Sequence, residues 1–367
     1  MLYLLLAPLQ DSHIIFNVFR YVTFRSIMAF LTGIIFSMFI GKKLILVLKR
    51  RNAVEEIDED MPENHKSKKG TPTMGGIIIL AGLLISSLLW NDISNNYIIM
   101  MYLTTIWLGL FGFLDDYLKN FVKSKKGLIP KYKLLGQVSI ALFISIAIFY
   151  LYRNDPNVTR IQIPFLKDTS ISLGYLFIPF VVFMITGTSN AVNLTDGLDG
   201  LAAGVIAFSV IGLGVMAYLK GNFVIASYLN IEFIGEAAEL TVFNAALLGT
   251  LMGFLWYNTH PAEIFMGDTG SLALGGMLAQ MSILLREQIF FAIIGMIFIT
   301  ETLSVIIQTR YFKFTKKKYG VGKRVFLCAP LHHHFEKKGL KESKIVVRFW
   351  IVSILLLALG LATIKLR

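Results

Sequence analysis

The sequence Asn190-Ala-Val-Asn-Leu-Thr-Asp-Gly-Leu-Asp-Gly200 is a polar, glycine-containing break between two long apolar runs, near 174–190 and 201–218. Each run is long enough to cross a bilayer as a helix, whereas the break is too polar for the membrane core. Asp196 and Asp199 lie in this break among amides, a hydroxyl and glycines, a composition suited to holding a polar ligand. For Asp199 alone, an equally good alternative is that it caps the following helix.

The same alternation of apolar run and polar break extends along all 367 residues, of which 55% are hydrophobic and 13% aromatic. This apolar share exceeds that of ordinary soluble domains. The pattern predicts an all-α polytopic membrane protein, a single integral membrane domain over 1–367. About ten runs have the length that a membrane-spanning helix needs, and they lie near 24–47, 74–92, 97–114, 134–151, 174–190, 201–218, 241–257, 270–286, 288–308 and 345–364.

Basic residues indicate how the predicted spans are oriented. Most of the 35 Lys and Arg residues fall in one of the two alternating sets of loops, within 42–69, 119–133 and 310–344. Cytoplasmic loops carry such an excess, so both termini are predicted to face away from the cytosol. The net charge of +12 then reflects topology and attraction to the lipid bilayer rather than to nucleic acid. On the outer side, alternating polar and apolar residues near 160–173 predict a short β-hairpin.

The segment Lys68-Lys-Gly-Thr-Pro-Thr-Met-Gly-Gly76 sets two lysines, two threonines and three glycines against the start of a span. Backbone N–H groups and the positive end of a helix favour an anion there, so the segment resembles a phosphate cradle, although it is not a Walker loop. The alternative is a basic membrane flank followed by a threonine N-cap.

Asp115 and Asp116 are adjacent carboxylates where a helix is predicted to end. The helix dipole is already negative at that end and the two charges repel each other. Carboxylates so close to the membrane are expensive, which favours a functional role with a compensating cation, either Lys119 or a metal.

Two further motifs belong to cytosolic loops. Asp268 directly precedes a span in Phe265-Met-Gly-Asp-Thr-Gly-Ser271, where an N-cap role is about as well supported as a functional one. The triplet His332 to His334 lies within Pro330-Leu-His-His-His-Phe-Glu336. Consecutive imidazoles chelate one zinc ion poorly, so hydrogen bonding to phosphate is the better interpretation.

The predicted topology brings these motifs from five loops to one membrane face. Five carboxylates gathered there would raise one another's pKa values unless a cation lies among them, and a hard divalent ion with oxygen ligands is the simplest answer. Mg²⁺ fits best, because it completes its coordination with water and substrate phosphates. The implied chemistry is phosphoryl transfer at the lipid surface.

These motifs, in this order and between these spans, resemble the phospho-N-acetylmuramoyl-pentapeptide transferase family along the whole chain. The resemblance implies a multi-pass protein of the bacterial inner membrane whose active site faces the cytoplasm. It implies transfer of phospho-N-acetylmuramoyl-pentapeptide from UDP-N-acetylmuramoyl-pentapeptide to undecaprenyl phosphate. The products would be lipid I and UMP, in the first membrane step of peptidoglycan synthesis. A homodimer is left open.

The resemblance also implies roles for individual residues. It makes Asp268 the principal Mg²⁺ ligand and gives catalytic roles to Asp115, Asp116, Asp268 and His332. The residues implied to contact the substrate phosphate and sugar are Lys68, Thr73, Asn190, Asn193, Asp196, His333 and His334. Those implied to bind the nucleotide are Lys119, Gly197, Leu198, Asp199, Asn258, Phe265 and Gln308.

Two rival functions and one mechanistic alternative remain. A sister enzyme transfers N-acetylglucosamine 1-phosphate to the same carrier, but the histidine triplet with Pro330 and the Thr71-Pro-Thr-Met run favour the muramoyl branch. An ion-coupled transporter would place its charges near the bilayer midplane and show an internal repeat, neither of which the sequence suggests. Direct attack by the lipid phosphate is favoured over an aspartyl-phosphate intermediate.

Overall fold

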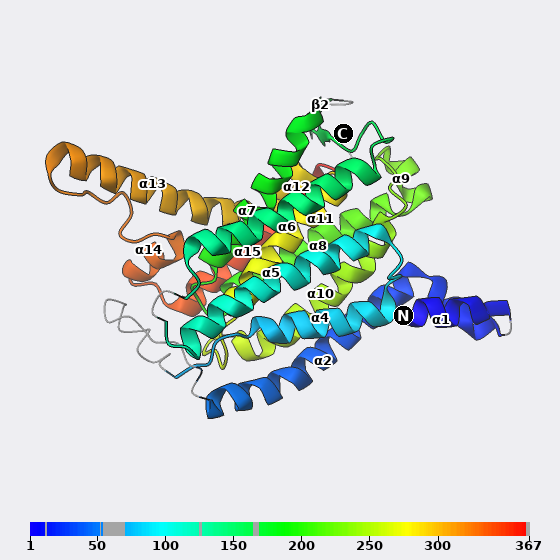
Figure 1. Cartoon of the computed structure of the whole chain (residues 1–367), viewed down its shortest axis with the longest axis horizontal. Helices are drawn as coiled ribbons and strands as arrows, with labels where there is room; N and C mark the ends of the chain where they lie inside the picture. Colours follow the sequence, from blue (N-terminus) through cyan, green and yellow to red (C-terminus); the bar gives the residue numbers. More distant parts are fainter. Residues whose placement is uncertain (12, 52, 54–69, 125–126, 164–168, 365–367) are drawn as a thin grey trace.

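The computed structural model describes residues 1–11, 13–51, 53, 70–124, 127–163 and 169–364. The chain is mostly helical, and its long helices lie side by side in one bundle (Figure 1). The helices are α1 (Leu2–Leu6), η1 (Ala7–Asp11), η2 (Ile14–Arg20), α2 (Val22–Arg50), α4 (Gly76–Trp90), α5 (Asn96–Asn120), α6 (Pro130–Leu151), η3 (Gly174–Leu176), α7 (Phe177–Thr195), α8 (Leu201–Lys220), α9 (Phe223–Leu229), α10 (Ala237–Asn258), α11 (Gly267–Leu284), α12 (Gln288–Ile294), α13 (Met296–Tyr319), α14 (Leu331–Lys337) and α15 (Glu342–Ala362).

Every predicted apolar run is mainly helical, although the run at 288–308 is divided between α12 and α13, and seven of the described helices are long and apolar enough to cross a membrane. An eighth is obtained if α12 and α13 count as one span, although the pair is bent by 75°. The α4 helix is shorter, at 15 residues. The chain is therefore the helical, polytopic type of protein that was predicted. The number ten and the outward position of the termini stay predictions.

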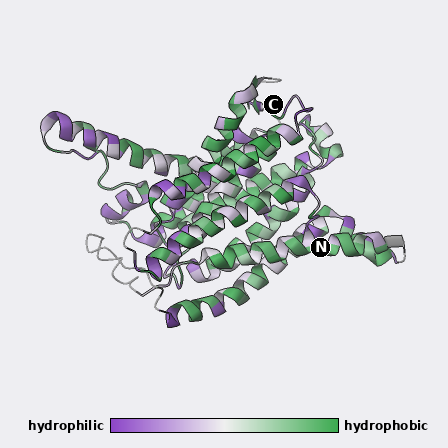
Figure 2. Cartoon of the chain, viewed as in Figure 1, coloured by the Kyte–Doolittle hydropathy of each residue, from purple (hydrophilic) through white to green (hydrophobic). Residues whose placement is uncertain are grey.

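Hydropathy follows this arrangement. Apolar residues line most of the long helices, and hydrophilic ones gather at helix ends and on the far part of α13, which projects from the bundle (Figure 2). The α11 helix lies in the interior, because every residue from Thr269 to Leu284 is buried. It packs against α5 and α7.

Two glycines allow other backbones to approach the start of α11. A Cβ atom on Gly112 of α5 would lie 2.2 Å from the carbonyl oxygen of Asp268, and one on Gly76 of α4 would lie 2.1 Å from the nitrogen of Gly270. Only glycine fits at such distances. As a result, α4 and α5 both meet the N-terminus of α11, where Asp268 lies.

The predicted outer hairpin is present as two antiparallel strands, β1 (Arg160–Gln162) and β2 (Ser170–Ser172), with Ile161 opposite Ile171. Its side of the membrane stays a prediction.

The three capping alternatives are wrong. Gly200, in the left-handed conformation, is the N-cap of α8 in place of Asp199. Gly75 is the N-cap of α4, with no threonine side chain capping it. Met266 precedes α11, so Asp268 is the second residue inside that helix. The side chains of Asp199 and Asp268 are directed to other partners, described below.

Candidate active site

Asp268 is the centre of a polar cluster at the N-terminus of α11. Its Oδ2 atom accepts hydrogen bonds from the ammonium groups of Lys133, at 2.6 Å, and Lys119, at 3.1 Å. Its Oδ1 atom accepts one from the amide of Asn193 at 2.5 Å. The same amide donates to Ser271 Oγ at 2.8 Å. The structure thus brings together five side chains from four helices, α5, α6, α7 and α11.

Asp115 belongs to the same cluster and is only 2% exposed. Its Oδ2 atom lies 2.6 Å from Lys119 Nζ, one helical turn further along α5, and 3.7 Å from Lys133 Nζ. Its Oδ1 atom accepts a hydrogen bond from the backbone N–H of Leu128 at 2.6 Å. The expected compensation of Asp115 by Lys119 is confirmed. Buried charges need such partners.

Asp116 is compensated differently from what the sequence suggested. Its carboxylate accepts hydrogen bonds from the backbone N–H groups of Asp268, at 3.0 Å, and Thr269, at 2.9 Å, and from the Thr269 hydroxyl at 2.6 Å. The free N–H groups and the positive end of the α11 dipole stabilise this negative charge. Asp116 therefore caps another helix, and through its backbone contact it fixes the position of Asp268.

Lys133 was not among the predicted site residues. It lies in the first turn of α6, close to where the apolar run begins, so the sequence presents it as an ordinary basic membrane flank. Its side chain is directed inward, with 18% exposure, onto Asp268 and Asp115. The one usable signal was its position on the cytosolic side in a predicted loop that also holds Lys119.

A backbone pairing connects the Gly-rich segment to this cluster. The N–H of Phe265 donates to Pro72 O at 2.9 Å, and the N–H of Gly75 donates to Phe265 O at 2.7 Å. A Cβ atom on Gly267 would lie 2.7 Å from Asp116 Oδ2 and 3.0 Å from Thr73 Oγ1. Thr73 thus lies beside the carboxylates, as predicted for a substrate contact. Lys68 lies outside the described residues.

A cavity of about 300 Å³ opens beside the cluster. Asn190 contacts it, and its amide donates to Gln137 Oε1 at 2.9 Å. One side of the cavity is formed by the charged groups of the cluster, and another by the apolar residues Pro130 and Leu134 at the start of α6. It is lined by Asp115, Lys119, Leu128, Pro130, Lys133, Leu134, Gln137 and Asn190.

The turn from Gly197 to Gly200 forms a second group of predicted residues. The N–H of Gly200 donates to Asn258 Oδ1 at 3.1 Å, and the Asn258 amide donates to Ile264 O at 2.8 Å. Asn258 therefore links the turn, through its Oδ1 atom, to the loop between α10 and α11, through its amide nitrogen. Leu198 is buried in the apolar core. Its contribution to a ligand is then limited to its backbone.

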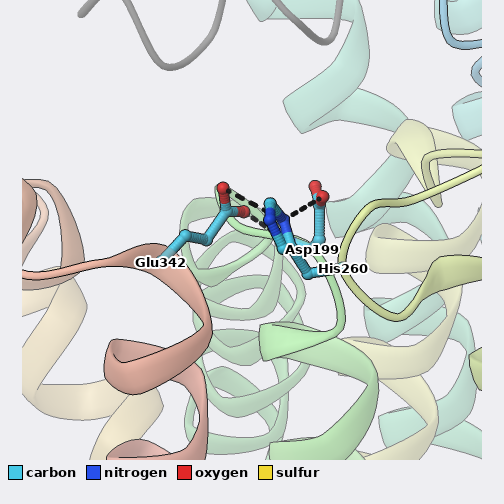
Figure 3. A group of neighbouring side chains, drawn as sticks. All are labelled: Asp199, His260 and Glu342. Atoms are coloured by element: carbon cyan, nitrogen blue, oxygen red, sulfur yellow. Dashed lines mark hydrogen bonds and ion pairs between the residues drawn. The ribbon is translucent and has the colours of Figure 1, made fainter.

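Asp199 in this turn faces His260 and Glu342 (Figure 3). Its Oδ2 atom lies 3.1 Å from His260 Nδ1 and accepts a hydrogen bond from the N–H of Ala262 at 3.1 Å. Neither His260 nor Glu342 was predicted, because they lie far from Asp199 in the sequence and match no motif considered there.

The three consecutive histidines have different surroundings because they lie on a helix, α14, where neighbouring side chains diverge. His332 is fully buried, and a Cβ atom on Gly197 would lie 2.2 Å from its Nε2 atom. Its Nδ1 atom lies 3.3 Å from Glu301. Burial lowers the pKa of His332 below its usual value. The histidine is therefore neutral at pH 7 and packs against the predicted nucleotide turn.

His333 and His334 are directed elsewhere. His333 Nδ1 lies 2.6 Å from Glu336 Oε2, and His334 Nδ1 accepts a hydrogen bond from the N–H of Leu327 at 3.1 Å. Gln308 is similarly engaged, since its Oε1 atom accepts from the backbone N–H groups of Val325 and Phe326. These contacts order the loop before α14. The predicted roles of these three residues in substrate binding stay predictions.

Two groups of described residues have donor atoms close enough to share a metal ion: Asp115, Asp116 and Asp268, and Asp199, His260 and Glu342. The first consists of oxygen donors only, which suit Mg²⁺. In this group Asp116 is saturated by hydrogen bonds from α11, whereas Asp115 and Asp268 share two ammonium groups. Those two carboxylates are therefore the ones whose partners a cation could replace.

Comparison with known protein families agrees with this geometry. The model described as "Glycosyl transferase family 4" matches residues 98–286, a range that contains Asp115, Asp116, Asn193 and Asp268. The signature described as "Phospho-N-acetylmuramoyl-pentapeptide-transferase signature 1" matches residues 68–80, the predicted phosphate cradle.

Curated relatives are similar along the entire chain. A protein of Granulibacter bethesdensis is 51% identical and one of Thermodesulfovibrio yellowstonii is 47% identical, each covering 100% of both chains. A protein of Chlorobium phaeobacteroides is 48% identical over 96% of this chain and 95% of its own. All three are named phospho-N-acetylmuramoyl-pentapeptide-transferase.

Proposed function

Because the chain belongs to the phospho-N-acetylmuramoyl-pentapeptide transferase family, we propose that it transfers phospho-N-acetylmuramoyl-pentapeptide from its UDP-linked form to undecaprenyl phosphate. An oxygen of the lipid phosphate forms a bond to the phosphorus next to the sugar. The bond from that phosphorus to the bridging oxygen breaks, and the oxygen leaves with the electron pair as part of UMP. One pyrophosphate linkage replaces another, and lipid I is the product.

The observation that carries this proposal is the cluster of Asp115, Asp116 and Asp268 with two lysines at the N-terminus of α11. Lys119 and Lys133 place two positive charges beside these carboxylates, where they can hold the phosphates of both substrates. Phosphoryl transfer depends mainly on positioning and on stabilising negative oxygens. The apolar residues Leu128 and Leu134 of the adjoining cavity suit an acceptor that arrives from the bilayer.

We include Mg²⁺ as the cofactor, held by Asp268 with Asp115 beside it. When bound, the ion would neutralise charge on the phosphates during transfer. The chain's own residues do the rest. Asn193 orients Asp268 through its 2.5 Å hydrogen bond, and Asp116 fixes the start of α11. With Asp268 and Asp115 holding the ion, Lys119 and Lys133 would be able to contact phosphate oxygens.

Direct attack by the lipid phosphate is the mechanism that we favour. A phosphate monoester is mostly dianionic at pH 7, so it needs little help from a general base. An aspartyl-phosphate mechanism requires a free carboxylate as nucleophile. Asp116 is 3% exposed and holds three hydrogen bonds from α11, and Asp115 is bonded to Lys119 and Leu128. These contacts favour direct attack, since either carboxylate would first have to leave its partners before it could act as a nucleophile.

The test is UMP release by the purified chain with Mg²⁺, undecaprenyl phosphate and each UDP-sugar in turn. We expect release with UDP-N-acetylmuramoyl-pentapeptide. Activity with UDP-N-acetylglucosamine alone would overturn the assignment to the muramoyl branch. UMP release in a single turnover without lipid acceptor would show a covalent intermediate and so contradict direct attack.

The metal assignment has its own test. We expect Asp268→Asn to abolish Mg²⁺-dependent UMP release, since an amide is a much weaker ligand for a hard cation. Survival of both the activity and its Mg²⁺ dependence would show that another residue holds the ion.

A further inference from the structure

Asp199, His260 and Glu342 form a triad that joins three segments distant in the sequence (Figure 3). Asp199 lies in the turn between α7 and α8, His260 in the loop between α10 and α11, and Glu342 in the first turn of α15. In Figure 3 the His260 ring lies between the two carboxylates. His260 Nδ1 is 3.1 Å from Asp199 Oδ2 and 3.6 Å from Glu342 Oε2.

Glu342 also holds the backbone of the turn. The N–H of Asp199 donates a hydrogen bond of 2.7 Å to Glu342 Oε1. Glu342 lies at the N-terminus of α15, where the helix dipole stabilises a negative side chain. A hydrogen bond to a charged acceptor is stronger than one between neutral groups. Both carboxylate oxygens of Glu342 thus contact other members of the triad: Oε1 contacts the backbone of Asp199 and Oε2 contacts His260.

The turn is held at its other end as well. Gly200 donates to Asn258 and its carbonyl accepts a hydrogen bond of 3.3 Å from Trp350 Nε1 of α15. The orientation of residues 197–200 therefore depends on α15 through two side chains, Glu342 and Trp350. Of these, only Glu342 bonds to the backbone of Asp199.

We infer that Glu342, assisted by His260, is a positioning residue for nucleotide recognition: it fixes the Asp199 turn that receives the uracil ring. This inference rests on the proposed function, and on the nucleotide-binding role that the family resemblance implies for Gly197, Leu198 and Asp199, which would place the uracil ring of the UDP-sugar against this turn. A turn held in its binding conformation avoids an ordering cost when the ligand binds. Loss of Glu342 therefore weakens binding of the nucleotide substrate.

Replacing Glu342 should affect binding of the nucleotide substrate and not of the lipid phosphate. The reason is that the triad and the cluster around Asp268 are built on different elements. The cluster around Asp268 is built on α5, α6, α7 and α11, through Lys119, Lys133 and Asn193. The triad is built on the α7–α8 turn, the α10–α11 loop and α15. We therefore expect the KM for undecaprenyl phosphate and kcat to change little when Glu342 is replaced.

The experiment compares Glu342→Ala, Glu342→Gln and His260→Ala in the purified full chain. We expect Glu342→Ala to raise the KM for UDP-N-acetylmuramoyl-pentapeptide roughly tenfold, the usual cost of a hydrogen bond to a charged group. Glu342→Gln keeps an oxygen that can accept from the N–H of Asp199 and should restore most of the affinity. His260→Ala should have a smaller effect, because 45% of the His260 side chain is exposed. Ser343→Ala, at the exposed neighbouring position, is the matched control.

Binding of UDP, measured by calorimetry on the same proteins, separates this inference from the proposed function. If the wild-type chain releases no UMP, the proposed function fails, while the ratio of UDP affinities still tests the role of Glu342. An unchanged KM and UDP affinity in Glu342→Ala would overturn the inference. So would an equal rise in the KM for the lipid, or a loss that Glu342→Gln does not relieve. If Glu342→Ala does not fold, Glu342→Met takes its place in the same measurements, because methionine fills similar space but offers the N–H of Asp199 only a weak acceptor.

Discussion

At the residue scale, Lys133 connects two carboxylates of the cluster, Asp268 and Asp115. Its Nζ atom donates a hydrogen bond of 2.6 Å to Asp268 Oδ2 and lies 3.7 Å from Asp115 Oδ2. We expect Lys133→Met to lower kcat/KM for UMP release by about a hundredfold, the typical loss when one stabilising charge or donor is removed from a reacting oxygen. Steady-state assays of UMP release at saturating Mg²⁺ measure this change in kcat/KM.

The control is Lys131→Met, which removes an exposed lysine from the same helical turn. It should retain activity within about threefold, since surface charges contribute little. Equal losses in both variants would mean that the general charge of the loop matters and not the position of Lys133.

The burial of His332 predicts how the stability of the folded protein depends on pH. Burial lowers its pKa in the folded protein, whereas the unfolded chain keeps a value near 6.5. As pH falls through about 6.5, the unfolded chain takes up a proton that the folded one does not, so stability is lost on the acid side. Above that pH both forms are neutral and the contribution vanishes.

The measurement is the melting temperature of wild type and His332→Gln between pH 7.5 and 5.5. We expect the wild type to lose more stability over this range than the variant, regardless of their difference at pH 7.5. His13→Gln, at an exposed position, should decline in parallel with the wild type. A parallel decline of His332→Gln would refute the prediction.

The site was predictable where its residues lie in motifs that carry unusual chemistry. Asp115 and Asp116 could be proposed because carboxylates at the C-terminal end of a membrane helix are expensive, whereas the role of Asp268 was implied by the family resemblance. Lys133 and Glu342 could not, since each resembles an ordinary residue at the start of a helix and only the tertiary structure supplies its partner. The contacts of Asp116 with the N-terminus of α11 were missed for the same reason, because the sequence does not show which helix end lies beside it.

At the element scale, the close packing of α5 against α11 positions Asp268. A Cβ atom on Gly112 would lie 2.2 Å from Asp268 O and 2.7 Å from Thr269 Cα. Backbone atoms cannot move aside as a side chain can, so Gly112→Ala should separate the helices. We expect a loss of about 1–3 kcal/mol in stability, as for other overpacked sites, together with a fall in activity larger than that loss explains. Thermal unfolding and UMP release at a temperature well below the melting point measure the two effects.

Gly187→Ala in α7 is the matched control, because no atom lies within 4 Å of the Cβ that it would add. Alanine favours a helix over glycine by up to about 1 kcal/mol, so this variant should be no less stable than wild type. Equal behaviour of the two variants would show that the helix crossing does not constrain the site.

Helix positions were predictable from the lengths of the apolar runs, but one span differs. The run at 288–308 appears continuous, yet α12 and α13 meet at Gly295 with a 75° bend. A single glycine is common inside membrane helices, so it gives no clear sign of a break. Beyond the bend, α13 contributes Glu301 to the contact with His332 and then leaves the bundle (Figure 1).

At the scale of the whole molecule, the side of the membrane on which the site lies is still a prediction from the basic loops. The chain has one cysteine, Cys328, in the basic segment before α14 and partly exposed. The positive-inside rule places it in the cytosol. We expect a membrane-impermeant maleimide to label it only after the inner membrane is permeabilised. In a Cys328→Ser background, a Tyr175→Cys variant, at a position 84% exposed beside the outer hairpin, should be labelled in intact spheroplasts. The reverse pattern would place the Asp268 cluster outside the cell, where UDP-linked substrates are not made, and the proposed reaction would then lack its donor.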